Sequence, residues 1–296
     1  MLKTETPAAS HAQLDQYPTI ELVNVLVDDQ FAAVEAVRAA APRISAAVTA
    51  ALPRIQAGGR IIYVGAGTSG RLGVLDSVEL YPTFSWPPER AIALLAGGNK
   101  AMFVAVEGAE DDLQQGAADL QAVQPTANDI VLLLAASGAT PYVLGALRAA
   151  RAIGALTVGF ANNVDAPVAL EADIGVTLDT GSEIISGSTR LKAGTSQKLA
   201  LNTFSTALMV RLNKVYGNLM VDLKPTNAKL VKRAVRLTMI ATGADEAAAR
   251  AVLEHCNFHI KVAIVALKKA VSVEQASALL DAAQGSVRRA LETGEI

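Results

Sequence analysis

The stretch from Arg60 to Gly73, Arg-Ile-Ile-Tyr-Val-Gly-Ala-Gly-Thr-Ser-Gly-Arg-Leu-Gly, constrains the fold of this chain most strongly. Its apolar run, Ile61 to Val64, has no polar alternation, which is typical of a strand buried on both faces of a parallel sheet. Glycines with two hydroxyl residues between them follow, and Ser69 stands where a helix N-cap is expected. A strand, a glycine turn and a helix N-terminus favour an anion site, most often for phosphate. A tight turn without a ligand is the alternative.

Residues 65 to 70 read Gly-x-Gly-x-x-Gly, the pattern of dinucleotide-binding loops. That class also needs an acidic residue about 20 positions later, at the end of the second strand. The second expected strand, Ala91–Leu95, is followed by Ala-Gly-Gly, and the Gly-Lys-Ser/Thr of a Walker loop is absent. The hydroxyl pair therefore fits a compact phosphomonoester better. The residues expected to contact it are Gly67, Thr68, Ser69 and Gly70.

Composition excludes several classes of protein. Hydrophobic residues make up 51% of the 296 positions, enough for a sizeable core, and the formal net charge of −2 provides no basic surface for nucleic acid. Cys256 is the single cysteine, which excludes an internal disulfide and a multi-cysteine metal site. The N-terminal residues contain no apolar signal core, and no apolar run reaches the length of a membrane span. We therefore expect a cytoplasmic protein that does not interact with nucleic acid or membranes.

After residue 58 the pattern alternates between strand and helix. The expected strands are Arg60–Val64, Ala91–Leu95, Asp129–Ala135, Ala155–Phe160 and Ile174–Leu178. The expected helices are 69–80, 99–106, 111–123, 141–153 and 188–215. This alternation predicts an α/β fold, a three-layer αβα sandwich around a five-stranded parallel sheet. Ligands of such sheets bind beyond the carboxyl ends of the strands.

The flanking segments are expected to be helical. Residues 1–58 should form a polar arm without its own core, followed by helices that pack on the sheet domain, with Thr19 capping one helix and Pro42 starting another. Residues 59–221 should form the sheet domain. Residues 222–296 should form a small helical bundle resembling a ubiquitin-associated fold, with Asn227 as an N-cap and a capping box at Ser272.

Two further loops carry hydroxyls at strand-to-helix turns. One follows the third expected strand, and the other precedes the long helix expected to begin near Arg190. Each could hold the same phosphate, or could only cap its helix, and the basic residues of the second loop could pair with phosphate or form a solvated face. The candidate ligands are Ser137, Gly138, Thr140, Ser186, Ser188, Thr189 and Lys192.

Five motifs carry a resemblance to a known family. They are Gly65-Ala-Gly-Thr-Ser-Gly-Arg-Leu-Gly-Val-Leu-Asp76, Ala105-Val-Glu-Gly-Ala-Glu-Asp111, Ala136-Ser-Gly-Ala-Thr-Pro-Tyr142, Gly187-Ser-Thr-Arg-Leu-Lys-Ala-Gly-Thr195 and Lys214-Val-Tyr-Gly-Asn-Leu-Met-Val-Asp222. By these five motifs taken together, the chain resembles the N-acetylmuramic acid 6-phosphate etherases over nearly its whole length.

The resemblance implies a sugar isomerase (SIS) fold, a homodimer and no cofactor. It implies an enzyme, a carbon–oxygen lyase, that removes the D-lactyl ether from carbon 3 of N-acetylmuramic acid 6-phosphate. The products would be N-acetylglucosamine 6-phosphate and D-lactate, within recycling of cell-wall sugars. Two stretches depart from the usual family pattern, Val78-Glu-Leu-Tyr-Pro-Thr-Phe84 and Gly181-Ser-Glu183. They bear on substrate preference more than on the class of reaction.

The implied elimination needs a base for the carbon 2 proton and an acid for the leaving lactate. By resemblance the catalytic pair is Glu79 and Glu110, with Glu79 as the acid and Glu110 as the base. The division of roles is open, and from the residues alone either glutamate could be a surface carboxylate.

Other functions remain compatible with the same motifs. A non-catalytic sugar-phosphate regulator and an aldose–ketose isomerase would share the phosphate loops. His255 and His259 have the spacing of a zinc pair on a helix, but the glutamate that follows the first histidine in the zinc motif is replaced by Cys256, so no metal site is expected.

Overall fold

The computed structural model describes residues 3–8 and 10–292 of the chain. They divide into two compact units, Met1–Val78 with Pro88–Thr206, and Glu79–Pro87 with Ala207–Ile296. These divisions differ from the expected boundaries at residues 58 and 221. The N-terminal helices belong to the sheet unit, and two helices, α3 (Gly67–Phe84) and α7 (Lys192–Arg211), contribute residues to both units.

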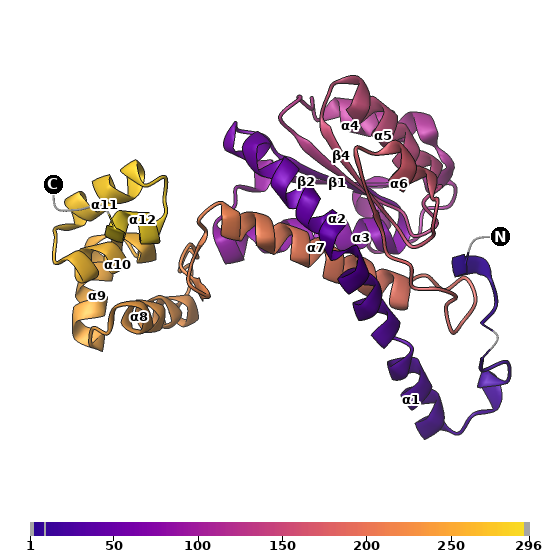
Figure 1. Cartoon of the computed structure of the whole chain (residues 1–296), viewed down its shortest axis with the longest axis horizontal. Helices are drawn as coiled ribbons and strands as arrows, with labels where there is room; N and C mark the ends of the chain where they lie inside the picture. Colours follow the sequence, from indigo (N-terminus) through magenta and orange to yellow (C-terminus); the bar gives the residue numbers. More distant parts are fainter. Residues whose placement is uncertain (1–2, 9, 293–296) are drawn as a thin grey trace. The chain divides into compact units, whose positions relative to one another are not determined.

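The first unit is built on a five-stranded sheet whose order is β2-β1-β3-β4-β5, with all neighbours parallel (Figure 1). Strands β1, β3 and β4 are buried along their whole length, as the unbroken apolar runs predict. All five expected strands are confirmed, with ends shifted by a residue or so. Their bounds are β1 Ile61–Gly65, β2 Ala91–Leu95, β3 Ile130–Leu134, β4 Leu156–Ala161 and β5 Ile174–Thr177.

Helices cover both faces of the sheet, which confirms the three-layer sandwich. On one face, Ile62 and Val64 of β1 share a core with Tyr142, Val143 and Leu147 of α5. Helices α4 and α6 lie on this same face (Figure 1). On the other face α2 packs against β3, β4 and β5. The helices of this unit, besides α3 and α7, are α1 Thr19–Asp28, α2 Phe31–Gln56, α4 Leu113–Ala122, α5 Pro141–Ala152 and α6 Pro167–Glu171.

Helix α2 is one continuous helix, whereas the sequence predicted a break at Pro42. Both Pro42 and Pro53 lie inside it. Proline removes one backbone hydrogen bond and costs about 3 kcal/mol in a helix interior. A single apolar stripe on both sides of Pro42 offsets that cost by burial against the sheet. The buried residues of this stripe are Ala33, Ala36, Ala40, Ile44, Ala47, Val48, Ala51 and Ile55.

Three further local predictions were wrong. Thr19 is the first residue of α1, with Pro18 in the N-cap position. The helix expected over 99–106 is a single 3-10 turn, Gly98–Met102, whose first residue and the preceding Gly97 both have positive φ. The helix expected over 188–215 is shorter, because α7 spans Lys192–Arg211 and a two-stranded hairpin, β6 (Val215–Tyr216) with β7 (Leu219–Met220), follows it.

The second unit has its own apolar core, to which each of its five C-terminal helices contributes. The predicted caps are confirmed: Asn227 accepts a hydrogen bond from the Leu230 N–H at 3.0 Å, and Ser272 and Gln275 form a capping box. The helices are α8 Ala228–Thr242, α9 Glu246–His255, α10 Ile260–Lys269, α11 Val273–Ala282 and α12 Val287–Glu292. Within the described residues, no helix is long and apolar enough to span a membrane.

Candidate active site

A cavity of about 350 Å³ lies beyond the carboxyl ends of β1 and β3, within the size range of small-ligand sites. These strands are neighbours in the middle of the sheet, yet the helices that follow them cover opposite faces. Where connections leave to opposite faces, the loops separate and a crevice opens between them. The strand order therefore creates the cavity. Its lining residues are Glu5, Ala66, Thr68, Ser69, Glu110, Asp111, Ala135, Ala136, Ser137, Ala139, Thr140, Pro141 and Thr189.

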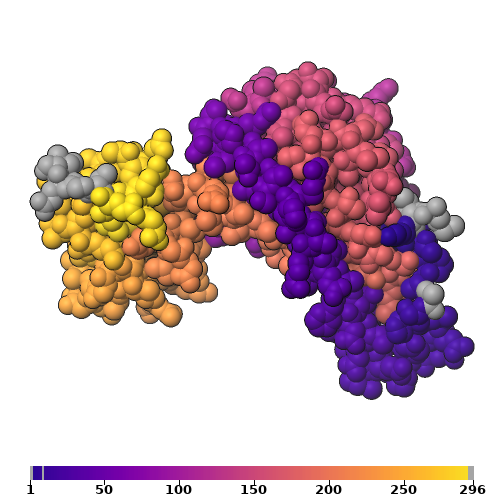
Figure 2. Space-filling model, in the orientation of Figure 1, coloured from indigo at the N-terminus to yellow at the C-terminus, as the bar shows by residue number. Residues whose placement is uncertain are grey.

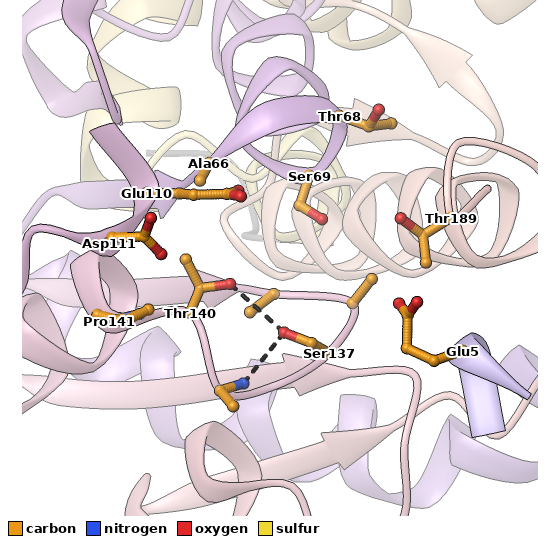
Figure 3. A pocket seen from close by; sticks show the side chains of 13 residues that line it. Glu5, Ala66, Thr68, Ser69, Glu110, Asp111, Ser137, Thr140, Pro141 and Thr189 are labelled. Atoms are coloured by element: carbon orange, nitrogen blue, oxygen red, sulfur yellow. Dashed lines mark hydrogen bonds between the residues drawn. The ribbon is translucent and has the colours of Figure 1, made fainter. Parts of the chain in front are cut away.

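The first wall is the turn from β1 into α3, which brings Thr68 and Ser69 to the cavity (Figure 3). A Cβ on Gly70 would lie 2.6 Å from the Gly65 carbonyl oxygen, so only glycine allows the helix to start this close to the strand. Ser69 lies inside the first turn of α3, which corrects its predicted place as the N-cap. The unpaired N–H groups of a first helical turn favour an anion.

The second wall is the loop from β3 into α5. The Ser137 hydroxyl accepts a hydrogen bond from the Ala139 N–H at 3.2 Å and lies 3.5 Å from the Thr140 hydroxyl (Figure 3). Pro141 is the first residue of α5, as predicted, whereas the N-cap position is occupied by Thr140 and not by Ser137. Ser137 and Thr140 thus both lie at a helix start and face the cavity.

The third wall is Thr189, which lies before α7. Two of the other residues expected from this turn make their bonds elsewhere. Ser186 donates its hydroxyl proton to the Glu5 carbonyl oxygen at 3.2 Å, and the Lys192 ammonium is buried in an ion pair with Asp29 at 2.6 Å. Of the described candidates, Gly67, Gly70, Gly138, Ser186, Ser188 and Lys192 do not belong to the lining of this cavity.

The start of α7 is capped by a carboxylate instead of a hydroxyl. Glu183 accepts hydrogen bonds from the Lys192 N–H at 3.2 Å and the Ala193 N–H at 2.9 Å, and its side chain is fully buried. Burial raises the pKa of Glu183, while the two backbone hydrogen bonds act in the opposite direction. This glutamate stands in Gly181-Ser-Glu183, one of the two stretches that depart from the family pattern. It therefore caps the start of α7, which follows Thr189 in the chain.

The two glutamates predicted to be catalytic are placed differently. Glu110 lies in a 3-10 turn, Ala109–Asp111, and its carboxylate lines the cavity on the side of Ala66, with Asp111 beside it (Figure 3). Glu79 lies further along α3 than Ser69, is exposed, and falls in the second unit of the chain. The carboxylates that line the cavity are therefore Glu110, Asp111 and Glu5.

Sequence reasoning missed Glu5. The N-terminal arm was expected to lack a core, but Thr4 is fully buried. No periodicity over so short a segment could have shown this, because the contacts are with residues more than 150 positions away.

The described residues contain no group of three His, Cys, Asp or Glu side chains that could hold a metal ion. His255 lies 3.9 Å from Glu274, an exposed pair on neighbouring helices of the second unit.

Comparisons with known proteins agree with this architecture. A family model described as the glucokinase regulatory protein N-terminal SIS domain matches residues 43–151. A phosphoheptose isomerase from Francisella tularensis has a similar structure, with a TM-score of 0.50 and 18% sequence identity over 66% of this chain and 100% of that chain. At this identity the likeness shows the fold alone.

Two relatives match almost the whole chain. The N-acetylmuramic acid 6-phosphate etherase of Deinococcus radiodurans is 57% identical over 293 residues, which are 99% of this chain and 96% of that protein. The protein of the same name from Pectobacterium atrosepticum is 49% identical over 293 residues, 99% of this chain and 97% of that protein. With this identity over nearly the full length of both chains, the protein belongs to the N-acetylmuramic acid 6-phosphate etherase family.

Proposed function

We propose that the cavity binds the phosphate of N-acetylmuramic acid 6-phosphate between its hydroxyl-bearing walls. Thr68 and Ser69 on α3 and Ser137 and Thr140 at α5 provide donors to the phosphate from two sides, and Thr189 before α7 provides a further donor toward the sugar. Two of these walls end in helix N-termini, which favour negative charge. None of the described lining residues is a lysine or arginine, so the proposed binding depends on hydroxyls and backbone N–H groups.

We propose that the bound sugar opens and loses its lactyl ether by elimination. The open-chain aldehyde makes the carbon 2 proton acidic, and a base removes it. The carbon 3–oxygen bond then breaks, and lactate leaves with a proton from an acid. Water adds its hydroxyl to carbon 3 and a proton to carbon 2, so the net reaction is hydrolysis of the ether to N-acetylglucosamine 6-phosphate and D-lactate.

Glu110 is proposed as the base because its carboxylate faces the same cavity as the proposed phosphate ligands (Figure 3). Glu79 is proposed as the acid because it matches the second catalytic glutamate of the family. Metal or cofactor participation is not part of this proposal.

The observation that carries the proposal is the full-length match to the Deinococcus radiodurans etherase, together with a carboxylate among convergent hydroxyls. The test is release of D-lactate from N-acetylmuramic acid 6-phosphate, followed with a D-lactate dehydrogenase assay. The unphosphorylated sugar is the control, and it should release far less. Absence of lactate from the phosphorylated sugar would overturn the proposal.

A non-catalytic regulator is the second candidate, favoured by the match of residues 43–151 to the regulatory-protein SIS model. Binding of the sugar phosphate without lactate release would support it. An aldose–ketose isomerase would instead convert a phosphorylated aldose to its ketose without loss of any group.

We also propose that the protein is a homodimer. Helix α1 has no buried residue among its ten, and the indigo segment that contains it lies at the surface (Figure 2). An apolar stripe with the spacing of a helix–helix seam continues from α1 into α2 and is 45–70% exposed. A second copy would bury it on both chains by the same contacts. The stripe consists of Ile20, Val23, Val27, Phe31 and Val34.

A cytoplasmic location is proposed from the substrate. A phosphorylated sugar carries charge that hinders its passage through a lipid bilayer, so an enzyme that consumes it acts where it is made.

A further inference from the structure

The N-terminal residues Lys3–Glu5 form a single 3-10 turn, here called the strap, that lies against the cavity. Its middle residue, Thr4, is fully buried. The Thr4 N–H donates to the Asn163 side-chain oxygen at 3.3 Å, and the Asn163 amide donates to the Thr4 hydroxyl at 3.0 Å. Asn163 is itself buried. The strap is thus held by a reciprocal pair of hydrogen bonds.

The strap also joins two walls of the cavity. The Asn163 amide donates a further hydrogen bond, at 3.0 Å, to the carbonyl of Ala136, the residue before Ser137. On the other side the Gly187 N–H donates to the Thr4 carbonyl at 3.2 Å, and Ser186 donates to the Glu5 carbonyl. Through these bonds the strap fixes the Ser137 loop against the turn that carries Thr189.

This placement brings the Glu5 carboxylate into the cavity lining. Figure 3 shows it facing Thr189, on the opposite side from Glu110. A Cβ on Gly187 would lie 3.1 Å from the Glu5 carboxylate oxygen, and Gly187 has a φ of +75°. The backbone at Gly187 thus leaves the space that the carboxylate occupies.

A carboxylate at this wall has two opposite effects on a ligand. It accepts hydrogen bonds, so it stabilises a hydroxyl or amide N–H of the sugar. It also repels a phosphate group nearby. We propose that Glu5 is a specificity-determining residue: it binds a neutral donor of the sugar and keeps the phosphate at the Ser69 and Ser137 side. This inference rests on the proposed sugar-phosphate function.

The test compares two ligands in the full chain by calorimetry, which needs no turnover. The probes are N-acetylglucosamine 6-phosphate and inorganic phosphate. Glu5→Gln should raise the dissociation constant of N-acetylglucosamine 6-phosphate about tenfold, because a hydrogen bond to a charged acceptor is lost. The same substitution should lower the dissociation constant of inorganic phosphate about threefold, because a like charge is removed. Glu89→Gln is the matched control, since Glu89 is exposed and precedes β2 at the opposite edge of the sheet, and both constants should stay as in wild type.

Opposite shifts for the two ligands distinguish recognition from a structural role, which would weaken both. A shift of both dissociation constants in the same direction, or a sugar-phosphate constant within twofold of wild type, would overturn the inference. Thr4→Val provides a second variant: Thr4 is a positioning residue, and loss of its hydroxyl should raise KM about fivefold with kcat nearly unchanged. If the wild-type protein binds both probes but releases no lactate, the proposed reaction fails while the calorimetry still decides the role of Glu5.

Discussion

The Tyr63 hydroxyl on β1 donates a 2.7 Å hydrogen bond to the carboxylate of Asp76 on α3, and both side chains are buried. The other Asp76 oxygen accepts from Asn202 at 2.6 Å and Ser205 at 3.2 Å, both on α7. Burial raises the pKa of Tyr63 well above its ordinary value, and the Asp76 charge raises it further. The Asp76 carboxylate on α3 therefore links β1 to α7. The cavity depends on this link, because the first turn of α3 and the segment before α7 form two of its walls.

Loss of the Tyr63 hydroxyl should destabilise the fold. Tyr63→Phe should lower the free energy of unfolding by about 1.5–3 kcal/mol, because a hydrogen bond to a charged acceptor is lost without a change in packing. Asp76→Ala should cost about 3 kcal/mol or more, since it leaves several buried donors unpaired. Urea unfolding measures both, with the exposed Tyr81→Phe as the control. An unfolding free energy for Tyr63→Phe equal to that of wild type would contradict this account.

A second buried carboxylate makes the free energy of unfolding depend on pH in the acid range. Asp129 accepts hydrogen bonds from the Arg60 guanidinium at 2.7 Å and from the backbone N–H groups of Arg60 and Thr126, each at 2.8 Å. Burial raises the pKa of Asp129, but these bonds and the Arg60 charge outweigh it and hold the pKa below its usual value. The stabilisation is therefore complete above the unfolded-state pKa, near about 3.9, and is lost as pH falls through the lower folded-state pKa.

Asp129→Asn should accordingly lower the unfolding free energy by about 3 kcal/mol at neutral pH, because Arg60 loses its charged partner. The difference from wild type should shrink as pH is lowered below about 4. Chemical denaturation at a series of pH values measures it. Asp165→Asn is the matched control, since Asp165 is exposed and its positive φ suits asparagine. If the difference in unfolding free energy between Asp129→Asn and wild type stayed constant down to the lowest pH, the lowered pKa of Asp129 would be contradicted.

Ser137 should affect substrate binding more than turnover. Ser137→Ala removes one donor to the proposed phosphate, so KM should rise on the order of tenfold with a smaller change in kcat. Steady-state lactate release measures both constants. Ser45→Ala, on the exposed side of α2, should match wild type. An unchanged KM in Ser137→Ala would place the phosphate away from this loop.

Isotope exchange should distinguish the roles of the two proposed catalytic glutamates. Exchange of the carbon 2 proton in heavy water needs the base, whereas lactate release needs the base and the acid. Glu110→Gln should lose both activities, and Glu79→Gln should lose lactate release but keep some exchange, each loss being on the order of 10²–10⁴-fold. Nuclear magnetic resonance follows exchange, and thermal melting confirms folding. The reverse pattern would exchange the two roles, and near-normal lactate release from both variants would remove the carboxylate pair from the mechanism.

Disruption of the apolar stripe should change the oligomeric state. Phe31→Asp introduces a charge at a side chain that is 65% exposed, and it should weaken self-association at least about tenfold. Leu170→Asp, at 67% exposure on α6, is the matched control and should leave association unchanged. Sedimentation velocity measures both. A monomeric, fully active wild-type protein at micromolar concentration would count against the homodimer.

The order of strands and helices in the sheet domain followed from the sequence, because unbroken apolar runs such as Ile61–Val64 and helical spacing are local signals. The caps at Asn227 and Ser272 were equally predictable, since each depends on residues three positions apart. The hydroxyl loops after β1 and β3 were identified as candidate phosphate ligands for the same reason.

Other features depended on contacts between distant residues. The continuity of α2 through Pro42 depends on burial against the sheet, which outweighs the local preference of proline. Lys192 was a plausible phosphate ligand until the fold paired it with Asp29, 163 positions away. Glu5 reaches the cavity because Thr4 is bound by Asn163, 159 positions away. Local spacing determines which element forms, whereas the partner of a buried polar group is decided only when the chain brings distant donors and acceptors together, because each must be satisfied once water is excluded.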